Sequence, residues 1–126
     1  MKVTRVMHAS SNVVGSLEDT VRFYSSVFGM EPTERPDVPG VRGSWFQAAD
    51  AQIHLVDAPM QGSGIDPTGP HFCLGIADLN EAIAELEAKN IEYVRATQGP
   101  KEIVQIWVVD PAGNTIELQQ DPDYKP

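Results

Sequence analysis

Three histidines and one glutamate stand at positions where they could hold a metal ion. His8, His54 and His71 are all the histidines of the chain, and a spacing of 63 residues separates His8 from His71 and also His54 from Glu117. Imidazole and carboxylate groups are typical ligands of borderline divalent cations. The pattern therefore predicts one bound divalent ion, Ni²⁺, Zn²⁺, Fe²⁺, Co²⁺ or Mn²⁺, with its identity left open.

Each histidine taken singly has an ordinary structural explanation. A lone histidine in a strand is usually a core or surface residue with a satisfied hydrogen bond. The placement of all three at related positions favours the metal site, with His8, His54, His71 and Glu117 as ligands. His54 has a further alternative, which is to point into the cavity without bonding the ion.

The equal spacing reflects two halves of the chain with the same order of elements. Hydrophobic alternation and helical periodicity predict strand, helix and three strands in each half. In residues 3–9 the alternation puts His8 on the same side as Thr4 and Val6. The expected strands are 3–9, a short one within 31–43, 44–49, 52–56, 71–76, 93–97, 103–109 and 115–119.

Residues at the ends of the expected helices give their boundaries. Ser16 with Asp19, and Asp78 with Glu81, resemble capping boxes, and Gly29 and Asn90 suit the left-handed position that ends a helix. The segment Asp110-Pro-Ala-Gly-Asn predicts a turn before the last strand.

The chain therefore divides into one domain made of two repeats. Repeat one spans 1–57, a linker rich in proline and glycine spans 58–70, repeat two spans 71–120, and a flexible tail spans 121–126. We predict an α+β fold in which two tandem βαβββ modules form a curved mixed sheet, or open barrel, around the metal site. Duplication brings equivalent positions together about a pseudo-twofold axis, so the four ligands are expected to meet.

Four further residues are candidates for the substrate pocket. Cys73 lies two residues after His71 and so faces the same cavity, although a buried cysteine is usually only a small core residue. Gln105 and Trp107 alternate on one face of their strand, and Trp107 suits the core equally well. Arg42 could bind an anionic substrate group, against the default of a solvated arginine.

Composition excludes several classes of partner. The chain has 126 residues and a formal net charge of −9, which repels phosphate backbones and anionic membranes and argues against nucleic acid and membrane partners. No stretch approaches the roughly 20 apolar residues of a membrane span, and the N-terminus lacks the apolar core of a signal peptide. The single cysteine rules out an internal disulfide and favours a reducing cytoplasm.

Three segments resemble the vicinal oxygen chelate superfamily, which includes glyoxalase I, methylmalonyl-CoA epimerase, fosfomycin-resistance proteins, bleomycin-resistance proteins and extradiol dioxygenases. They are 19–30, 71–76 and 109–118. The resemblance implies paired βαβββ modules with metal ligands at His8, His71 and Glu117. His54 stands where glyoxalase I has a glutamate and the epimerase a glutamine. The resemblance also implies that such chains commonly form homodimers.

The function expected from this set is a divalent-metal-dependent lyase or isomerase of the glyoxalase type, acting on a small substrate with two neighbouring oxygens. Glu117 would be its catalytic base. Three alternatives stay open: an epoxide or thiol addition enzyme like the fosfomycin-resistance proteins, an Fe²⁺ extradiol-type dioxygenase, and a small-molecule binding or resistance protein without catalysis.

Overall fold

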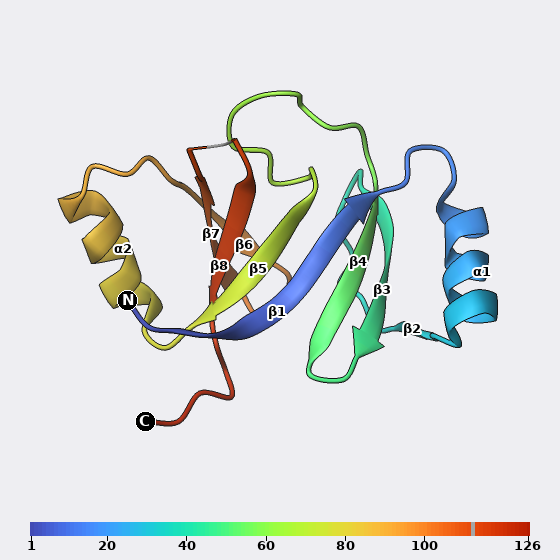
Figure 1. The fold of residues 1–126 in the computed structure, drawn as a ribbon, viewed down its shortest axis with the longest axis horizontal. Coiled ribbons are helices and arrows are strands. Elements are labelled where there is room, and N and C mark those ends of the chain that lie inside the picture. The colour runs from blue at the N-terminus through green and yellow to red at the C-terminus, as the bar shows by residue number, and fades with distance from the viewer. Residues whose placement is uncertain (112) are drawn as a thin grey trace.

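The computed structural model describes residues 1–111 and 113–126. In this part of the chain, eight strands form one mixed sheet and two helices flank it (Figure 1). The strands are β1 (Val3–Asn12), β2 (Pro32–Thr33), β3 (Arg42–Ala48), β4 (Ala51–Asp57), β5 (His71–Ile76), β6 (Val94–Gln98), β7 (Ile103–Val109) and β8 (Thr115–Gln120). The helices are α1 (Leu17–Phe28) and α2 (Leu79–Ala88).

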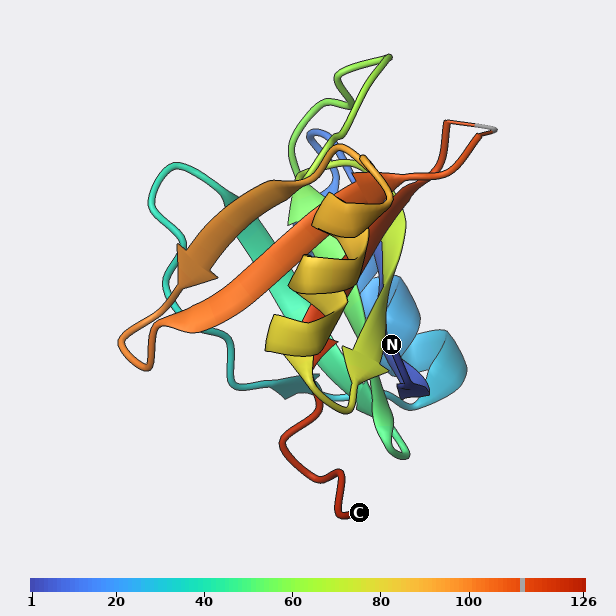
Figure 2. The same ribbon diagram turned by 90° about the vertical axis from the view of Figure 1, so that its left-hand side faces the viewer.

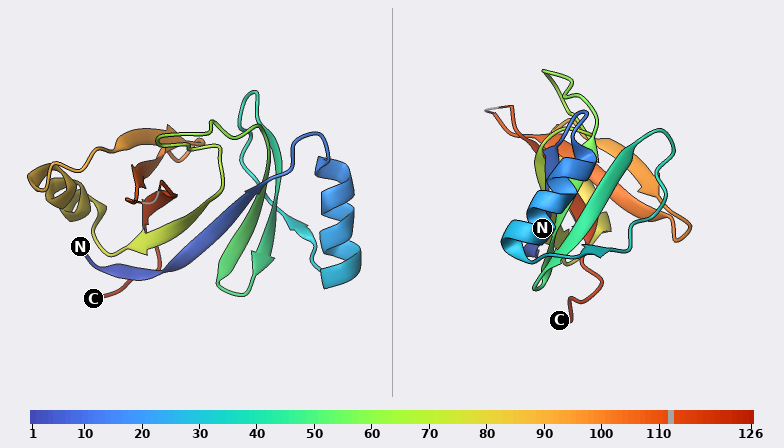
Figure 3. Two further views of the ribbon diagram at one scale, coloured as in Figure 1. Left: turned by 45° about the horizontal axis from the view of Figure 1, so that its top comes forward. Right: turned by 90° about the vertical axis from the view of Figure 1, so that its right-hand side faces the viewer.

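The order of the strands shows the duplication directly. The sheet runs β2-β3-β4-β1-β5-β8-β7-β6, so each half contributes four neighbouring strands and the halves meet at its centre. There β1 pairs antiparallel with β5, while β1 with β4 and β5 with β8 pair in parallel. In the left view of Figure 3, β1 runs across the middle of the molecule and joins the two halves. The predicted α+β class with a mixed sheet that does not close is confirmed.

Each helix covers the outer face of its own half of the sheet. Alternate residues of β7 and β8, such as Ile106 and Leu118, pack against Leu86 of α2, which Figure 2 shows in front of these strands. Phe46 and Leu55 of β3 and β4 pack in the same way against Leu17 of α1. Because strand residues alternate between faces, the intervening residues project to the opposite, inner side.

The two helix starts differ although their sequences look alike. The Asp78 side chain accepts a hydrogen bond from the backbone N–H of Glu81, as a capping residue should. The Ser16 hydroxyl instead contacts the carbonyl of Val13 and the Thr20 hydroxyl, and it makes no cap. The capping-box prediction is therefore wrong for Ser16.

Both predicted helix ends adopt the left-handed backbone. Gly29 has φ of 68° at the end of α1, and Asn90 has φ of 54° just beyond α2. Asparagine is one of the few residues other than glycine that tolerates this conformation, which is why it can serve in the second half.

An irregularity in β1 changes which way His8 faces. Val6 pairs with Leu74 and His8 with Cys73, so Met7 is an extra residue in β1. A bulge of this kind breaks the simple alternation of a strand. Val6 is exposed, whereas Met7 and His8 line the same cleft. The predicted alternation, with Val6 and His8 on one face, is wrong here.

The linker and the tail are both tied to β1. The Asn12 amide donates to the carbonyls of Ala58 and Thr68 at 2.7 and 2.8 Å and so holds together the two ends of the linker. Asp121 is buried and accepts hydrogen bonds from Thr4 and Arg5. The first residue of the segment predicted as a flexible tail is thus anchored to β1.

In the predicted turn at 110–114, Gly113 donates its backbone N–H to the carbonyl of Asp110, and Ala112 lies outside the described residues. Neither α1 nor α2 has the length and apolar content that a bilayer-crossing helix needs.

The two helix starts give a matched test of the capping geometry. We expect Asp78→Ala to lower the free energy of unfolding by about 1 kcal/mol, because the N–H of Glu81 loses its acceptor. Ser16→Ala should cost less than about 0.5 kcal/mol, since its hydroxyl satisfies no helix N–H. Urea unfolding followed by circular dichroism measures both, and equal losses would contradict this difference.

Candidate metal centre

Two neighbouring rows of side chains cross the inner face of the sheet. In one row, His8 on β1 lies opposite Cys73 on β5, which in turn lies opposite Glu117 on β8. In the next row, His54 on β4 lies opposite Ser10, which lies opposite His71. Residues opposite one another in a sheet point to the same side. Strand register therefore gathers all four predicted ligands into one small area.

Three of the four bring their ligand atoms together. Oε2 of Glu117 lies 2.8 Å from Nε2 of His8 and 3.4 Å from Nε2 of His71. The two imidazole nitrogens are 3.2 Å apart. Ligand atoms about 2.1 Å from an ion lie about 3.0 Å apart at right angles and about 3.4 Å apart at the tetrahedral angle. The triangle of these three atoms thus has the size of one face of a metal coordination shell.

The hydrogen bonds around His71 fix which nitrogen is free. Its Nδ1 lies 2.8 Å from the carbonyl oxygen of Gly69, so Nδ1 carries the proton and donates it. Nε2 then presents a lone pair toward His8, Glu117 and the Ser10 hydroxyl. A backbone carbonyl that orients a histidine in this way is the usual outer support of a metal ligand.

The Glu117 carboxylate is satisfied on one oxygen and unsatisfied on the other. Glu117 is 0% exposed, and its Oε1 accepts hydrogen bonds from Gln105 at 2.7 Å and from Gln119 at 3.0 Å. Oε2 is buried, and no described residue is assigned as its hydrogen-bond donor, although Nε2 of His8 and Nε2 of His71 lie beside it. A buried anionic oxygen beside two imidazole nitrogens is costly unless a proton or a metal ion lies between them. The donor set therefore fits a divalent cation.

The charge of Glu117 is maintained by its neighbours. Burial by itself would raise the pKa of this carboxyl, but the His71 and His8 rings beside it, together with Gln119, more than offset burial and hold the pKa well below its ordinary value. Glu117 is thus ionised at neutral pH, as a metal ligand or a proton acceptor must be.

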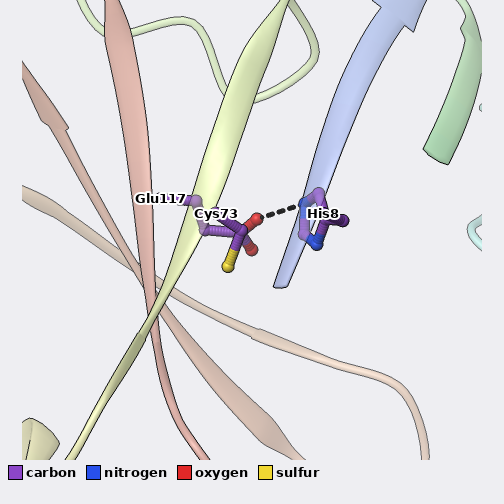
Figure 4. A group of neighbouring side chains, drawn as sticks. All are labelled: His8, Cys73 and Glu117. Carbon is purple, nitrogen blue, oxygen red and sulfur yellow. Dashed lines mark ion pairs between the residues drawn. The ribbon is translucent and has the colours of Figure 1, made fainter. Parts of the chain in front are cut away.

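Cys73 lies at the floor of the cluster. Its Sγ, a ring nitrogen of His8 and a carboxylate oxygen of Glu117 all lie within 4.8 Å of one another (Figure 4), which makes these three residues a candidate metal-binding triad. Cys73 is fully buried, and burial raises the pKa of its thiol well above the ordinary value, with the Glu117 carboxylate adding to the shift.

His54 is packed against the cluster through its ring. It is sandwiched between Trp45 and His8, with ring centroids 3.9 Å apart on both sides. Its Nε2 lies 2.9 Å from the Gln52 side-chain oxygen. Gln52 in turn donates to Gln47, whose own amide donates to two backbone carbonyls of the β3–β4 turn. This series of hydrogen bonds makes Nε2 of His54 a donor. Burial, together with the nearby His8 ring, lowers the pKa of His54 to about 2.

The cluster lies at the base of a two-part cleft. An inner chamber of about 190 Å³ contacts His8, His54, His71 and Glu117, and an outer cleft of about 860 Å³ opens beyond it. Of the predicted pocket residues, Gln105 and Trp107 line the inner chamber. Arg42 lies apart on the outer side, where it pairs with Glu18 and Asp57 and is 63% exposed.

Several residues of the cleft were absent from the predictions made from the sequence. They are Ser10, Arg35, Trp45, Gln52, Gln98 and Gln119. Gln119 lies two residues after Glu117 on the same strand, so strand periodicity could have placed it on the same face. Arg35 comes from the loop between β2 and β3, where the sequence carries no periodic signal.

Comparisons with known proteins agree with this geometry. A family model described as the Glyoxalase/Bleomycin resistance protein/Dioxygenase superfamily matches residues 5–118. The chain belongs to this superfamily. The resemblance predicted from the sequence is therefore confirmed, and the four expected ligands all lie within the matched range.

Individual proteins resemble this chain over most of its length, one in sequence and two in fold. The curated protein Glyoxylase I 4 of Arabidopsis thaliana is 28% identical over 125 residues, which cover 94% of this chain and 71% of its own. Methylmalonyl-CoA epimerase from Mycobacterium tuberculosis has a TM-score of 0.72 at 22% identity, covering 94% of this chain and 88% of its own. The Streptomyces coelicolor epimerase in complex with 2-nitronate-propionyl-CoA has a TM-score of 0.71 at 20% identity, covering 96% and 99%.

The support of Glu117 by Gln105 can be tested without a metal. We expect Gln105→Leu to lower the free energy of unfolding by about 1.5–3 kcal/mol, because a buried carboxylate loses a hydrogen-bond donor. Gln61→Leu, at an exposed linker position, is the matched control and should change stability by less than about 0.5 kcal/mol. Indistinguishable unfolding midpoints for the two variants would remove Gln105 from this role.

The burial of Cys73 predicts a thiol that is closed to reagents. We expect alkylation by iodoacetamide at pH 8 to be at least about tenfold slower in the native protein than in urea, because the thiol is buried and its pKa is raised. Mass spectrometry of the single cysteine measures both rates. Equal rates would mean that the sheet opens readily at its centre.

Proposed function

We propose that this chain is a divalent-metal-dependent lyase or isomerase of the glyoxalase type, which acts on a small substrate with two adjacent oxygens. The observation that carries the proposal is the fully buried Oε2 of Glu117, which lies beside Nε2 of two imidazoles at the base of a cleft. His8, His71 and Glu117 would hold the ion, and membership of the superfamily supports this assignment.

The protein's own groups supply the proton chemistry. A divalent ion in this position would act as a Lewis acid on two neighbouring substrate oxygens and make an adjacent C–H more acidic. Glu117, ionised and held at Oε1 by Gln105 and Gln119, can accept that proton at Oε2 when Oε2 is not bound to the ion, and can return it. The base is thus fixed in direction by two amides, which limits the face of the substrate from which it can take a proton.

His54 has a supporting role in this proposal. Its neutral ring stacks on His8 and keeps that imidazole in place, and the same stack with Trp45 covers one wall of the cleft. Because Nε2 of His54 donates to Gln52, the ring turns no Nε2 lone pair toward the cluster. The fourth ligand predicted from the sequence is accordingly the one to be tested by substitution.

The same geometry favours a second candidate. Two histidines and one carboxylate on one face of an ion form the arrangement used by Fe²⁺ enzymes that activate O₂. A centre held by these three ligands alone would keep three coordination positions open for a substrate and for oxygen. A dioxygenase of the extradiol type is therefore the alternative activity for this centre.

Metal analysis with turnover assays tests the proposal. We expect untagged protein to hold close to one divalent ion per chain, and His8→Ala and Glu117→Gln to lower metal affinity at least about tenfold. His54→Ala should keep its metal. Assays with a hemithioacetal, a methylmalonyl thioester, an epoxide and a catechol, each run in deuterated water and with an oxygen electrode, separate the activities. Deuterium in the product supports the isomerase.

The controls distinguish loss of metal from loss of fold. Circular dichroism of each variant must match that of the wild type, and Arg22→Gln on the exposed face of α1 should leave metal content unchanged. Stoichiometric iron with oxygen uptake would replace the isomerase by the dioxygenase. A folded protein that binds none of the five metals would refute both and favour a binding protein without catalysis.

A further inference from the structure

Arg35 is a cation without an anion. Among the described residues, Arg5, Arg22 and Arg42 each pair with carboxylates, and Arg95 is exposed. Arg35 is half-buried and forms no ion pair in the part of the chain that the structure describes. In a chain of net charge −9, a partly buried guanidinium left without a partner is unusual.

The guanidinium group of Arg35 is held in place, but few of its N–H donors bind an acceptor among the described residues. Its Nη2 donates to the carbonyl of Val41 at 3.0 Å, while its Nε is buried and has no hydrogen-bond partner. The group packs closely against β3, where a side chain at Gly43 would come within 3.1 Å of both Nε and Nη2. Burial lowers the pKa of Arg35, and nearby Asp37 opposes this shift without forming an ion pair. The guanidinium group is therefore fixed in position and keeps N–H donors that no described residue accepts.

Its position connects the two parts of the cleft. Arg35 lines both the outer cleft and the inner chamber, which also contains the His8, His71 and Glu117 cluster. The chamber contains a second unused donor, because Trp107 lines it and has a buried indole N–H without a partner. A ligand that fills this chamber of about 190 Å³ would contact both the cluster and Arg35.

We propose that Arg35 is an anion-binding residue that takes a single carboxylate of a small ligand in the inner chamber. The planar fork of a guanidinium matches the two oxygens of a carboxylate. The identification of that ligand as the substrate rests on the proposed function, and it narrows the substrate to an acyl compound that carries a carboxylate of its own.

The surroundings favour one carboxylate over a carrier rich in phosphate. The outer cleft is lined by four acidic residues, Glu34, Asp37, Asp50 and Asp123, and by only three basic ones. Of the basic residues, Arg5 already pairs with Asp121 and Asp123. Such a surface repels groups with several negative charges. The positive charge still available at the chamber is that of Arg35, which suits a single negative charge.

Binding of a minimal carboxylate to the metal-free protein tests the assignment. Propionate and its neutral analogue propionamide are titrated into chelator-treated protein, with the indole N–H resonances of Trp45 and Trp107, which line the chamber and are kept in every variant, followed by NMR. We expect a saturable shift with propionate, and binding at least about tenfold weaker with propionamide. Arg35→Gln should lose at least about tenfold in propionate affinity. Arg35→Lys keeps the charge but not the planar fork, so its propionate affinity should lie between those of the wild type and Arg35→Gln.

Matched variants decide the outcome. Arg22→Gln, an exposed arginine on α1, should bind propionate like the wild type, and circular dichroism confirms that each variant is folded. Inorganic phosphate should bind more weakly than propionate, and tighter phosphate binding would overturn the carboxylate assignment. Equal affinity in the wild type and Arg35→Gln, or a loss found in Arg42→Gln instead, would overturn the role of Arg35. Because no metal is present, this result does not depend on whether the metal centre proposed above exists.

Discussion

The buried carboxylate of Glu117 is the interaction on which this structure depends. A carboxylate with no solvent exposure requires full compensation, and here Gln105 and Gln119 satisfy one oxygen while two imidazoles face the other. Such an arrangement is stable only with a shared proton or a cation among these acceptors. The side chains around Glu117 are thus organised for charge, while the apolar packing lies on the opposite face of the sheet.

Duplication explains how one sheet can hold both the charged cluster around Glu117 and the apolar packing on its opposite face. Each half packs its helix against the outer face of its own four strands, and this leaves two separate apolar cores. The inner face, free of helices, is where the central strands β1 and β5 meet and where polar residues from both halves gather. Because the halves join edge to edge within one chain, His8 from the first half reaches His71 and Glu117 from the second without a partner subunit.

The cleft combines the His8, His71 and Glu117 cluster with a guanidinium, that of Arg35, which forms no ion pair with a described residue. The imidazole and carboxylate cluster needs a positive charge, while Arg35 needs a negative one, and both line the same small chamber. Electrostatic interactions strengthen as water is excluded. A ligand that offers negative charge to Arg35 and leaves room for a cation at the cluster would therefore be favoured in this chamber. The acidic rim of the outer cleft adds selection against ligands of high negative charge.

The sequence by itself determined the α+β class, the order of elements and the grouping of His8, His71 and Glu117, because periodicity and a repeated spacing are local or additive signals. Tertiary structure alone decided the bulge at Met7 and the lack of an ion pair at Arg35 among the described residues. These features depend on strand register and on which neighbour reaches a given nitrogen. Such geometry arises from contacts between distant segments, so no spacing in the chain encodes it.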